Sequence, residues 1–149
     1  MGIFELILFL SCVKILTHGL TELDPHTENE FNSNTIRANI FESLVSFDAQ
    51  MNIVPRLAAH WEKIDDTTWI FYLRRGVKFH NGKEFTAYDV VYSIDRIKKL
   101  IDSRMKDYII GIKSYIPLGK YKLKMVSYRS TLLNNLPFVF IISTIFVDA

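Results

Sequence analysis

The stretch LRRGVKFHNGKEFTAYDV, residues 73–90, carries strong local signals for several consecutive structural elements. Its first residues complete a segment of alternating large side chains, which predicts a strand. Asn81 and Gly82 then supply the positive φ angles of a tight turn. Thr86 can cap a helix, and the Asp89 carboxylate three residues later completes a capping box and complements the helix dipole. The stretch therefore predicts a strand, a turn, a cap and a helix.

Two amphipathic helices are expected. The first spans residues 34–45, with Ile36, Ile40 and Leu44 on one face. The second spans residues 86–100 and buries a stripe that contains four apolar residues of the same face, namely Val90, Val91, Ile94 and Ile97. Both helices are expected to cover one face of a sheet.

The strands of that sheet are predicted from alternation and from β-branched or aromatic runs. The segments are residues 13–17, 67–79, 109–117, 120–127 and 137–146. VPRLAAHWEKID is read as an extended piece that leads into a short helical turn ending near Trp61, and Asp65 and Asp66 as turn residues before the next strand. The order of elements predicts an α+β fold with a mixed or largely antiparallel sheet.

Composition and charge limit the class of protein. A chain of 149 residues with 49% hydrophobic and 23% charged residues can form one domain and bury about two-thirds of its unfolded surface. Residues 98–130 hold nine Lys or Arg against only two Asp. However, Lys120, Lys122 and Lys124 alternate with apolar residues, as in a strand with one wet face. A solvated strand face is therefore favoured over a nucleic-acid site.

Reactive groups do not form a recognised constellation. His80 and Asp89 are candidates for an acid–base pair, but the helix cap already accounts for Asp89 and no nucleophile lies nearby in sequence. The chain has four histidines, His18, His26, His60 and His80, and no His-x-x-x-His or Glu-x-x-His pair occurs among them. We expect no enzyme activity, no metal site and no cofactor.

The two ends of the chain are apolar. MGIFELILFLSC, residues 1–12, is read either as a degenerate export signal with a lipid-attachment cysteine or as an N-terminal strand with a buried Cys12. As the single cysteine, Cys12 excludes an internal disulfide. LPFVFIISTIFV, residues 136–147, is too short to span a bilayer and favours a buried strand.

Five pieces of the sequence together carry a resemblance to a known family. They are LDPH, IFESLV, VPRLAAHWE, TTWIFYLRRGVKFHNG and FTAYDVVYSIDR, all within residues 23–97. In order and in spacing these pieces resemble the N-terminal part of the family 5 extracellular solute-binding proteins, which are the peptide-, dipeptide- and nickel-binding components of ABC importers.

The resemblance implies a receptor with two lobes that closes on an oligopeptide or dipeptide and delivers it to ABC permease subunits in the membrane, outside the cytoplasm. Residues 13–149 are then a partial first lobe. Because closure needs two rigid bodies and solute affinity needs both, this chain alone is expected to be truncated and unable to bind. In the family, the loop after the first strand lies close to the ligand. The resemblance therefore implies that His18, Gly19 and Leu20 are at the edge of the cleft.

A second interpretation stays open. The chain is also compatible with a small independent α+β module that binds a protein partner through apolar surface which the rest of a family protein normally covers.

Overall fold

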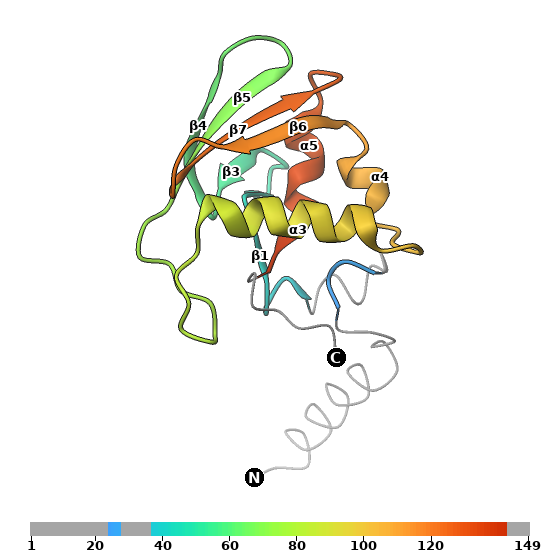
Figure 1. Ribbon diagram of the computed structural model, residues 1–149. Helices are drawn as coiled ribbons and strands as arrows, with labels where there is room; N and C mark the ends of the chain where they lie inside the picture. Colours follow the sequence, from blue (N-terminus) through green and yellow to red (C-terminus); the bar gives the residue numbers. More distant parts are fainter. Residues whose placement is uncertain (1–23, 28–36, 143–149) are drawn as a thin grey trace, which may run out of the picture.

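The computed structural model describes residues 24–27 and 37–142 (Figure 1). Its elements are β1 (Glu42–Ser43), β2 (Val45–Phe47), β3 (Ile53–Pro55), β4 (Ala58–Lys63), β5 (Thr68–Leu73), α3 (Ala87–Lys99), α4 (Lys106–Ile109), β6 (Ile112–Pro117), β7 (Lys122–Ser127), α5 (Leu132–Asn135), a 3-10 helix η1 (Leu136–Phe138) and β8 (Phe140–Ile141). One long helix and mainly antiparallel strands make up this part of the chain.

The main sheet has four strands in the order β4-β5-β7-β6, and two smaller sheets pair β1 with β8 and β2 with β3. Every one of these strand pairs is antiparallel. The prediction of an α+β fold with a largely antiparallel sheet is therefore confirmed.

The core lies between the main sheet and α3, which runs beneath the sheet in Figure 1. Phe71 of β5 and Leu123 of β7 are fully buried, as are Val90 and Ile94 of α3. Burying a side chain of this size stabilises a fold by about 1.5–3 kcal/mol. This packing explains the alternation in β7, where buried and half-buried residues alternate along the strand.

The opposite face of β7 confirms the prediction of a solvated lysine face. Lys122 and Lys124 are only partly buried, whereas the intervening Leu123 is fully buried. The Lys122 ammonium lies 4.9 Å from the centre of the Tyr72 ring on the neighbouring strand. Lys122 therefore contacts its own sheet.

The connection from β5 to α3 follows the prediction in outline. Strand β5 ends at Leu73, and not at residue 79, since Gly76 turns the chain with φ of 73°. The turn at the tip differs in one detail: Gly82 has φ of 83°, but Asn81 does not have a positive φ. The Asn81 side chain instead accepts a hydrogen bond from the Lys83 N–H at 3.0 Å, which orders the turn without a second left-handed residue.

The helix predicted at residues 86–100 is α3, and its predicted cap is confirmed. The Asp89 carboxylate accepts hydrogen bonds from the Thr86 N–H at 2.9 Å and from the Thr86 hydroxyl at 2.8 Å. The Lys83 ammonium forms an ion pair with the same carboxylate at 2.5 Å. Asp89 is completely buried by these contacts.

The helix predicted at residues 34–45 is wrong within the described part, residues 37–45. A single turn, in which the Phe41 N–H donates to the Arg37 carbonyl at 2.7 Å, gives way to β1 and β2. Leu44 and Val45 are adjacent and both buried, because strands distant in sequence pack around this segment. Helical spacing of apolar residues cannot detect such partners.

Three further boundaries differ from the predictions. The helical turn predicted near Trp61 is wrong, because Trp61 lies inside β4 and pairs with Phe71. The strand predicted at 109–117 begins only at Ile112, after the short helix α4. Within the described part of the last predicted strand, residues 137–142, Pro137 lies in η1 and only Phe140–Ile141 forms a strand. The strand predicted at 13–17 lies outside the described residues, as do residues 34–36 and 143–146.

Candidate functional site

A cluster of polar side chains joins the described segment 24–27 to the rest of the fold. Both Asp24 carboxylate oxygens accept hydrogen bonds from the Arg96 guanidinium, at 2.9 and 2.5 Å. The Arg96 side chain is 7% exposed and that of Asp24 is 18% exposed. The pair therefore links the LDPH piece to the last turn of α3 in a geometry with two hydrogen bonds, which fixes orientation as well as distance.

His26 extends this cluster to two other elements. Its Nε2 is 2.8 Å from the Phe140 carbonyl oxygen of β8, so this nitrogen carries the hydrogen that it donates. The His26 carbonyl accepts a hydrogen bond from the Ser103 hydroxyl at 2.5 Å. Asp24, His26, Arg96, Ser103 and Phe140 are called the N-terminal clamp below. The clamp gives His26 a structural role.

The charge of Asp24 depends on the clamp. Burial alone would raise the pKa of Asp24, but hydrogen bonds from Arg96 and from the His26 N–H, with the positive charge of Arg96, outweigh burial and lower it. Asp24 is therefore ionised at neutral pH.

The other polar residues of the quoted motifs do not form an acid–base pair. His80 is exposed on the turn before α3, whereas Asp89 is buried and binds Thr86 and Lys83. His60 stacks on the Tyr72 ring, with ring centres 4.4 Å apart. Across the described residues, no group of three or more His, Cys, Asp or Glu side chains is placed to hold a metal ion.

The predicted cleft-edge positions His18, Gly19 and Leu20, and the cysteine Cys12, lie outside the described residues. Sequence reasoning missed the clamp as a unit. A signal for it existed, since Asp24 and Arg96 are opposite charges in two of the quoted pieces, although 72 positions separate them.

For the described ranges, no helix is both long and apolar enough to cross a membrane.

Two hollows border the short β1–β8 sheet. One has a volume of about 550 Å³ and is lined by residues that include Phe79, Phe85 and Ile142. The other has a volume of about 450 Å³ and is lined by four phenylalanines and by Arg56, among other residues. The four are Phe41, Phe47, Phe138 and Phe140, and this second hollow is called the aromatic groove below.

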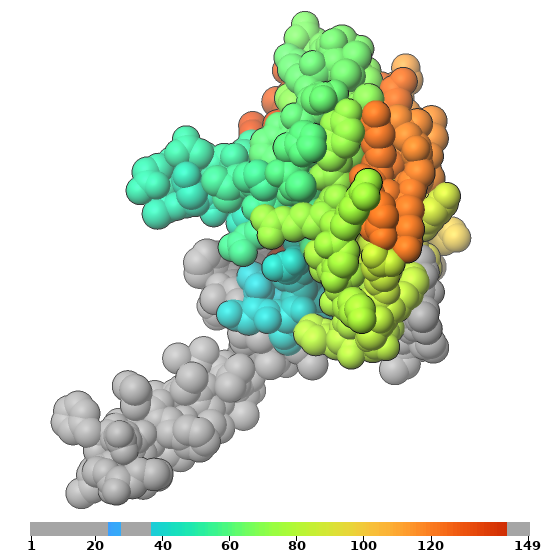
Figure 2. All heavy atoms as spheres, turned by 90° about the vertical axis from the view of Figure 1, so that its left-hand side faces the viewer, coloured from blue at the N-terminus to red at the C-terminus, as the bar shows by residue number. Residues whose placement is uncertain are grey.

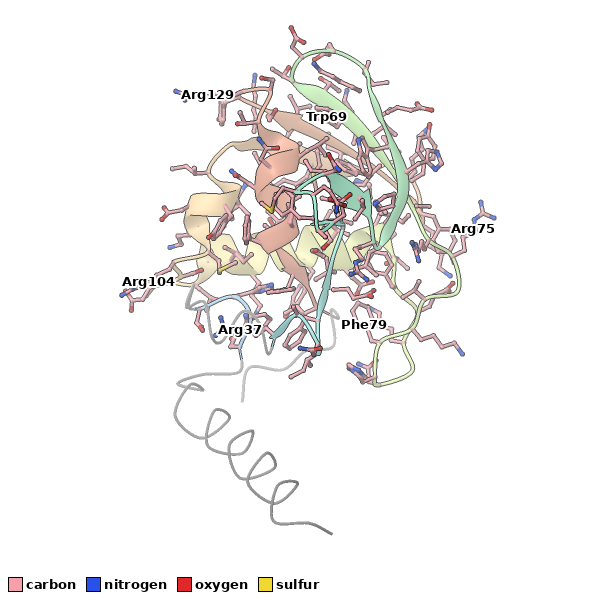
Figure 3. All side chains as sticks on the ribbon, turned by 180° about the vertical axis from the view of Figure 1, so that it is seen from behind. Arg37, Trp69, Arg75, Phe79, Arg104 and Arg129 are labelled. Atoms are coloured by element: carbon pink, nitrogen blue, oxygen red, sulfur yellow. The ribbon has the colours of Figure 1, made fainter. Side chains whose placement is uncertain are left out.

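Basic side chains do not gather in one place. Figure 3 shows Arg75 at the right, Arg104 at the lower left and Arg129 at the upper left of the molecule, and each is exposed. Arg75 lies 5.3 Å from the centre of the Tyr121 ring, which is an intramolecular contact. The distribution favours solvated cations over the continuous basic surface that nucleic-acid binding requires.

Comparisons with known proteins agree with this fold. Residues 52–147 match the family model for the middle part of bacterial extracellular solute-binding proteins, family 5. The protein YhjP of Bacillus subtilis (strain 168) is 35% identical over a stretch that covers 58% of this chain and 15% of that protein. The periplasmic oligopeptide-binding protein OppA of Salmonella typhimurium is 35% identical, covering 50% of this chain and 14% of that protein.

Solved structures show the same relation. The structure of Burkholderia pseudomallei OppA matches 83% of this chain and 28% of its own length, with a TM-score of 0.77 and 25% identity. These structural neighbours are bilobed periplasmic binding proteins. The matched stretch is thus a small part of the relatives' length. Because the family model covers more than half of the chain, the chain belongs to the bacterial extracellular solute-binding proteins, family 5.

Proposed function

We propose that this chain forms part of the first lobe of a receptor that captures oligopeptides or dipeptides outside the cytoplasm for an ABC importer. The proposal is supported by the fold, which matches 28% of the length of a solved OppA structure, and by the name of the Salmonella relative. In this assignment residues 13–149 belong to the lobe, and residues 1–12 are an export or lipid-attachment segment. The partners are the peptide and the permease subunits.

The motifs have a structural function in this proposal. Asp24, Arg96 and Asp89 all use their charges within the fold, so that the lobe is held rigid while other residues contact the solute. His18, Gly19 and Leu20 are assigned to the edge of the cleft. This assignment separates the residues that build the lobe from those that bind.

A chimera tests the role of the lobe. Residues 37–142 replace the matching stretch of Salmonella OppA, and peptide affinity is measured by calorimetry. We expect a chimera that folds and retains peptide binding, because the transplanted residues build scaffold. A folded chimera without peptide binding contradicts the proposal. Salmonella OppA is the reference protein.

The cleft edge is tested by extending the transplant to begin at residue 13. Leu20→Asp is expected to weaken peptide binding by about tenfold, because placing an uncompensated polar group at an apolar contact costs about 1–3 kcal/mol. The matched control is Ile64→Asp, at an exposed position in the turn between β4 and β5. An unchanged affinity for Leu20→Asp removes this residue from the site.

The 149-residue chain by itself is expected to bind peptides negligibly. A solute held between two lobes draws its affinity from both, and the chain matches 28% of the length of the solved Burkholderia protein. Calorimetry with a mixture of di- to pentapeptides is the measurement. Micromolar affinity would contradict the expectation.

A further inference from the structure

The hairpin formed by β2 and β3 projects from the body of the molecule, as Figure 2 shows at its left edge in teal. A network around Asp48 makes its tip rigid. The Asp48 carboxylate accepts hydrogen bonds from the Gln50 N–H at 2.9 Å and from the Asn52 N–H at 2.8 Å. The Asn52 side-chain amide donates to the same carboxylate at 3.0 Å. The tip is therefore a preorganised projection.

At the end of this projection lies Met51. Its φ is 63°, and of the non-glycine residues in the described ranges it alone has a positive φ. For an ordinary L-residue this conformation costs about 1–2 kcal/mol, which glycine would avoid. The Met51 side chain is 69% exposed, whereas Met105 and Met125 are completely buried. The fold thus holds one thioether outward on a rigid, strained tip.

The aromatic groove lies at the base of the same hairpin. Phe47 belongs to β2 and lies with its ring centre 6.0 Å from that of Phe138. Phe138 is 37% exposed, although the ring of Tyr108 also stacks on it at 4.8 Å. Phenylalanine walls are a chemically suitable site for a methionine side chain, because a thioether makes favourable contacts with aromatic rings.

The tip and the groove are complementary in charge and in position. Asp48 at the tip is an anion, and Arg56 at the groove is an exposed cation. Met51 follows Phe47 by four residues, so the tip lies within ~13 Å of the groove wall. A two-fold axis brings the same patch of both copies together, so a patch with both a projection and a hollow can make each contact twice.

We propose that two copies of this chain associate about a two-fold axis, each inserting the Met51 side chain of its hairpin into the aromatic groove of the other. The Asp48 carboxylate of each copy then approaches Arg56 of the second copy. This association uses neither the cleft-edge residues nor a bound peptide, so it is independent of the proposed transport role.

Sedimentation velocity over a wide concentration range tests the proposal on the whole chain. We expect a reversible dimer whose dissociation constant rises by about tenfold or more in Met51→Gly, as for loss of an anchor residue. Glycine relieves the positive φ, so the melting temperature is expected to stay equal or to rise. Ile101→Ser is the matched control, because Ile101 is 89% exposed and outside the proposed interface. The control is expected to dimerise normally.

A second measurement identifies the contact. The chain is produced with photo-methionine, and crosslinked dimers are digested and analysed by mass spectrometry. We expect crosslinks from position 51 to peptides that contain Phe138 or Phe41, and a weaker dimer in Phe138→Ser. A monomer at every concentration overturns the proposal. So does a dimer that Met51→Gly leaves unchanged, or that Ile101→Ser weakens to the same extent.

Discussion

The two polar clusters that hold α3 differ in how far apart their members lie in the sequence. In the helix cap, Lys83, Thr86 and Asp89 lie within six positions of one another. In the N-terminal clamp, Asp24 and Arg96 are 72 positions apart. Both clusters contain a buried, charge-assisted hydrogen bond, but the cap forms with its own helix whereas the clamp forms only when a distant segment docks.

The two clusters therefore contribute differently to the fold. The cap satisfies backbone groups at the first turn of α3, which any helix must do. The clamp instead fixes the position of one segment relative to another, and closing a long loop carries an entropic cost that increases slowly with its length. We infer that the cap stabilises α3 and that the clamp specifies where segment 24–27 attaches.

Of the substitutions considered for the two clusters, Asp24→Ala is expected to lower the free energy of unfolding the most. It leaves the guanidinium of Arg96, 7% exposed, buried without its carboxylate partner, and the free energy of unfolding should fall by about 3 kcal/mol. Urea unfolding followed by tryptophan fluorescence measures the change, since Trp69 is buried in the core.

The control for this substitution is the pair Asp24→Ala with Arg96→Met. Removing both charges should be less destabilising than the sum of the two single changes, because the Arg96 charge then no longer stays buried without the Asp24 carboxylate. An unfolding midpoint equal to that of the unsubstituted chain for Asp24→Ala would show that the clamp contributes no stability.

Low pH is expected to weaken the clamp by protonating Asp24. The folded pKa of Asp24 is below its ordinary value of 3.8, so the folded state favours the ionised form. The stability from this group is fully present above the unfolded pKa and is lost as pH falls through the folded pKa. We expect the chain to lose stability from about pH 4 downward, and Asp24→Asn to lose less over the same range. A pH series of melting curves is the measurement, and parallel curves would contradict this assignment.

Asp89→Asn addresses the cap and should have a smaller effect than Asp24→Ala. An asparagine oxygen can still accept from Thr86, so the main loss is the ion pair with Lys83, whose side chain is 27% exposed. We expect the free energy of unfolding to fall by about 1–2 kcal/mol. Urea unfolding of Lys83→Met, which leaves the buried Asp89 carboxylate without the Lys83 cation, is the comparison, and its loss should be at least as large. A clearly smaller loss for Lys83→Met than for Asp89→Asn would reverse this account.

The same contrast explains what the sequence could predict. The cap and α3 were predicted because their signals are local, namely Thr86, Asp89 and an apolar stripe. The largely antiparallel sheet was predicted because apolar and polar residues alternate along its strands. Leu123 and Lys124 of β7 are an example, and their burial alternates in the structure as well. The class of protein came from the spacing of the quoted pieces.

The failures concern residues whose partners are distant. Leu44 has helical spacing relative to Ile40, yet Ser43 pairs with Phe140 and Val45 with Pro55. The clamp was missed for the same reason, because no local pattern relates Asp24 to Arg96. The solute site is a separate matter, since His18, Gly19 and Leu20 lie outside the described residues.

The ion pair between Lys63 and Asp66 separates the effect of burial from the effect of closeness in sequence. Its two residues are as close in sequence as those of the cap, but they are exposed. The two side chains are 42% and 92% exposed, and the ammonium and carboxylate are 2.8 Å apart. If burial rather than closeness in sequence gives the cap its strength, Lys63→Ala should change the free energy of unfolding by no more than about 0.5 kcal/mol. Lys63→Ala also removes a contact 5.7 Å from the Trp69 ring, so Asp66→Ala, which spares that ring, is the control. A loss from Asp66→Ala as large as that from Asp89→Asn would mean that local pairing suffices without burial.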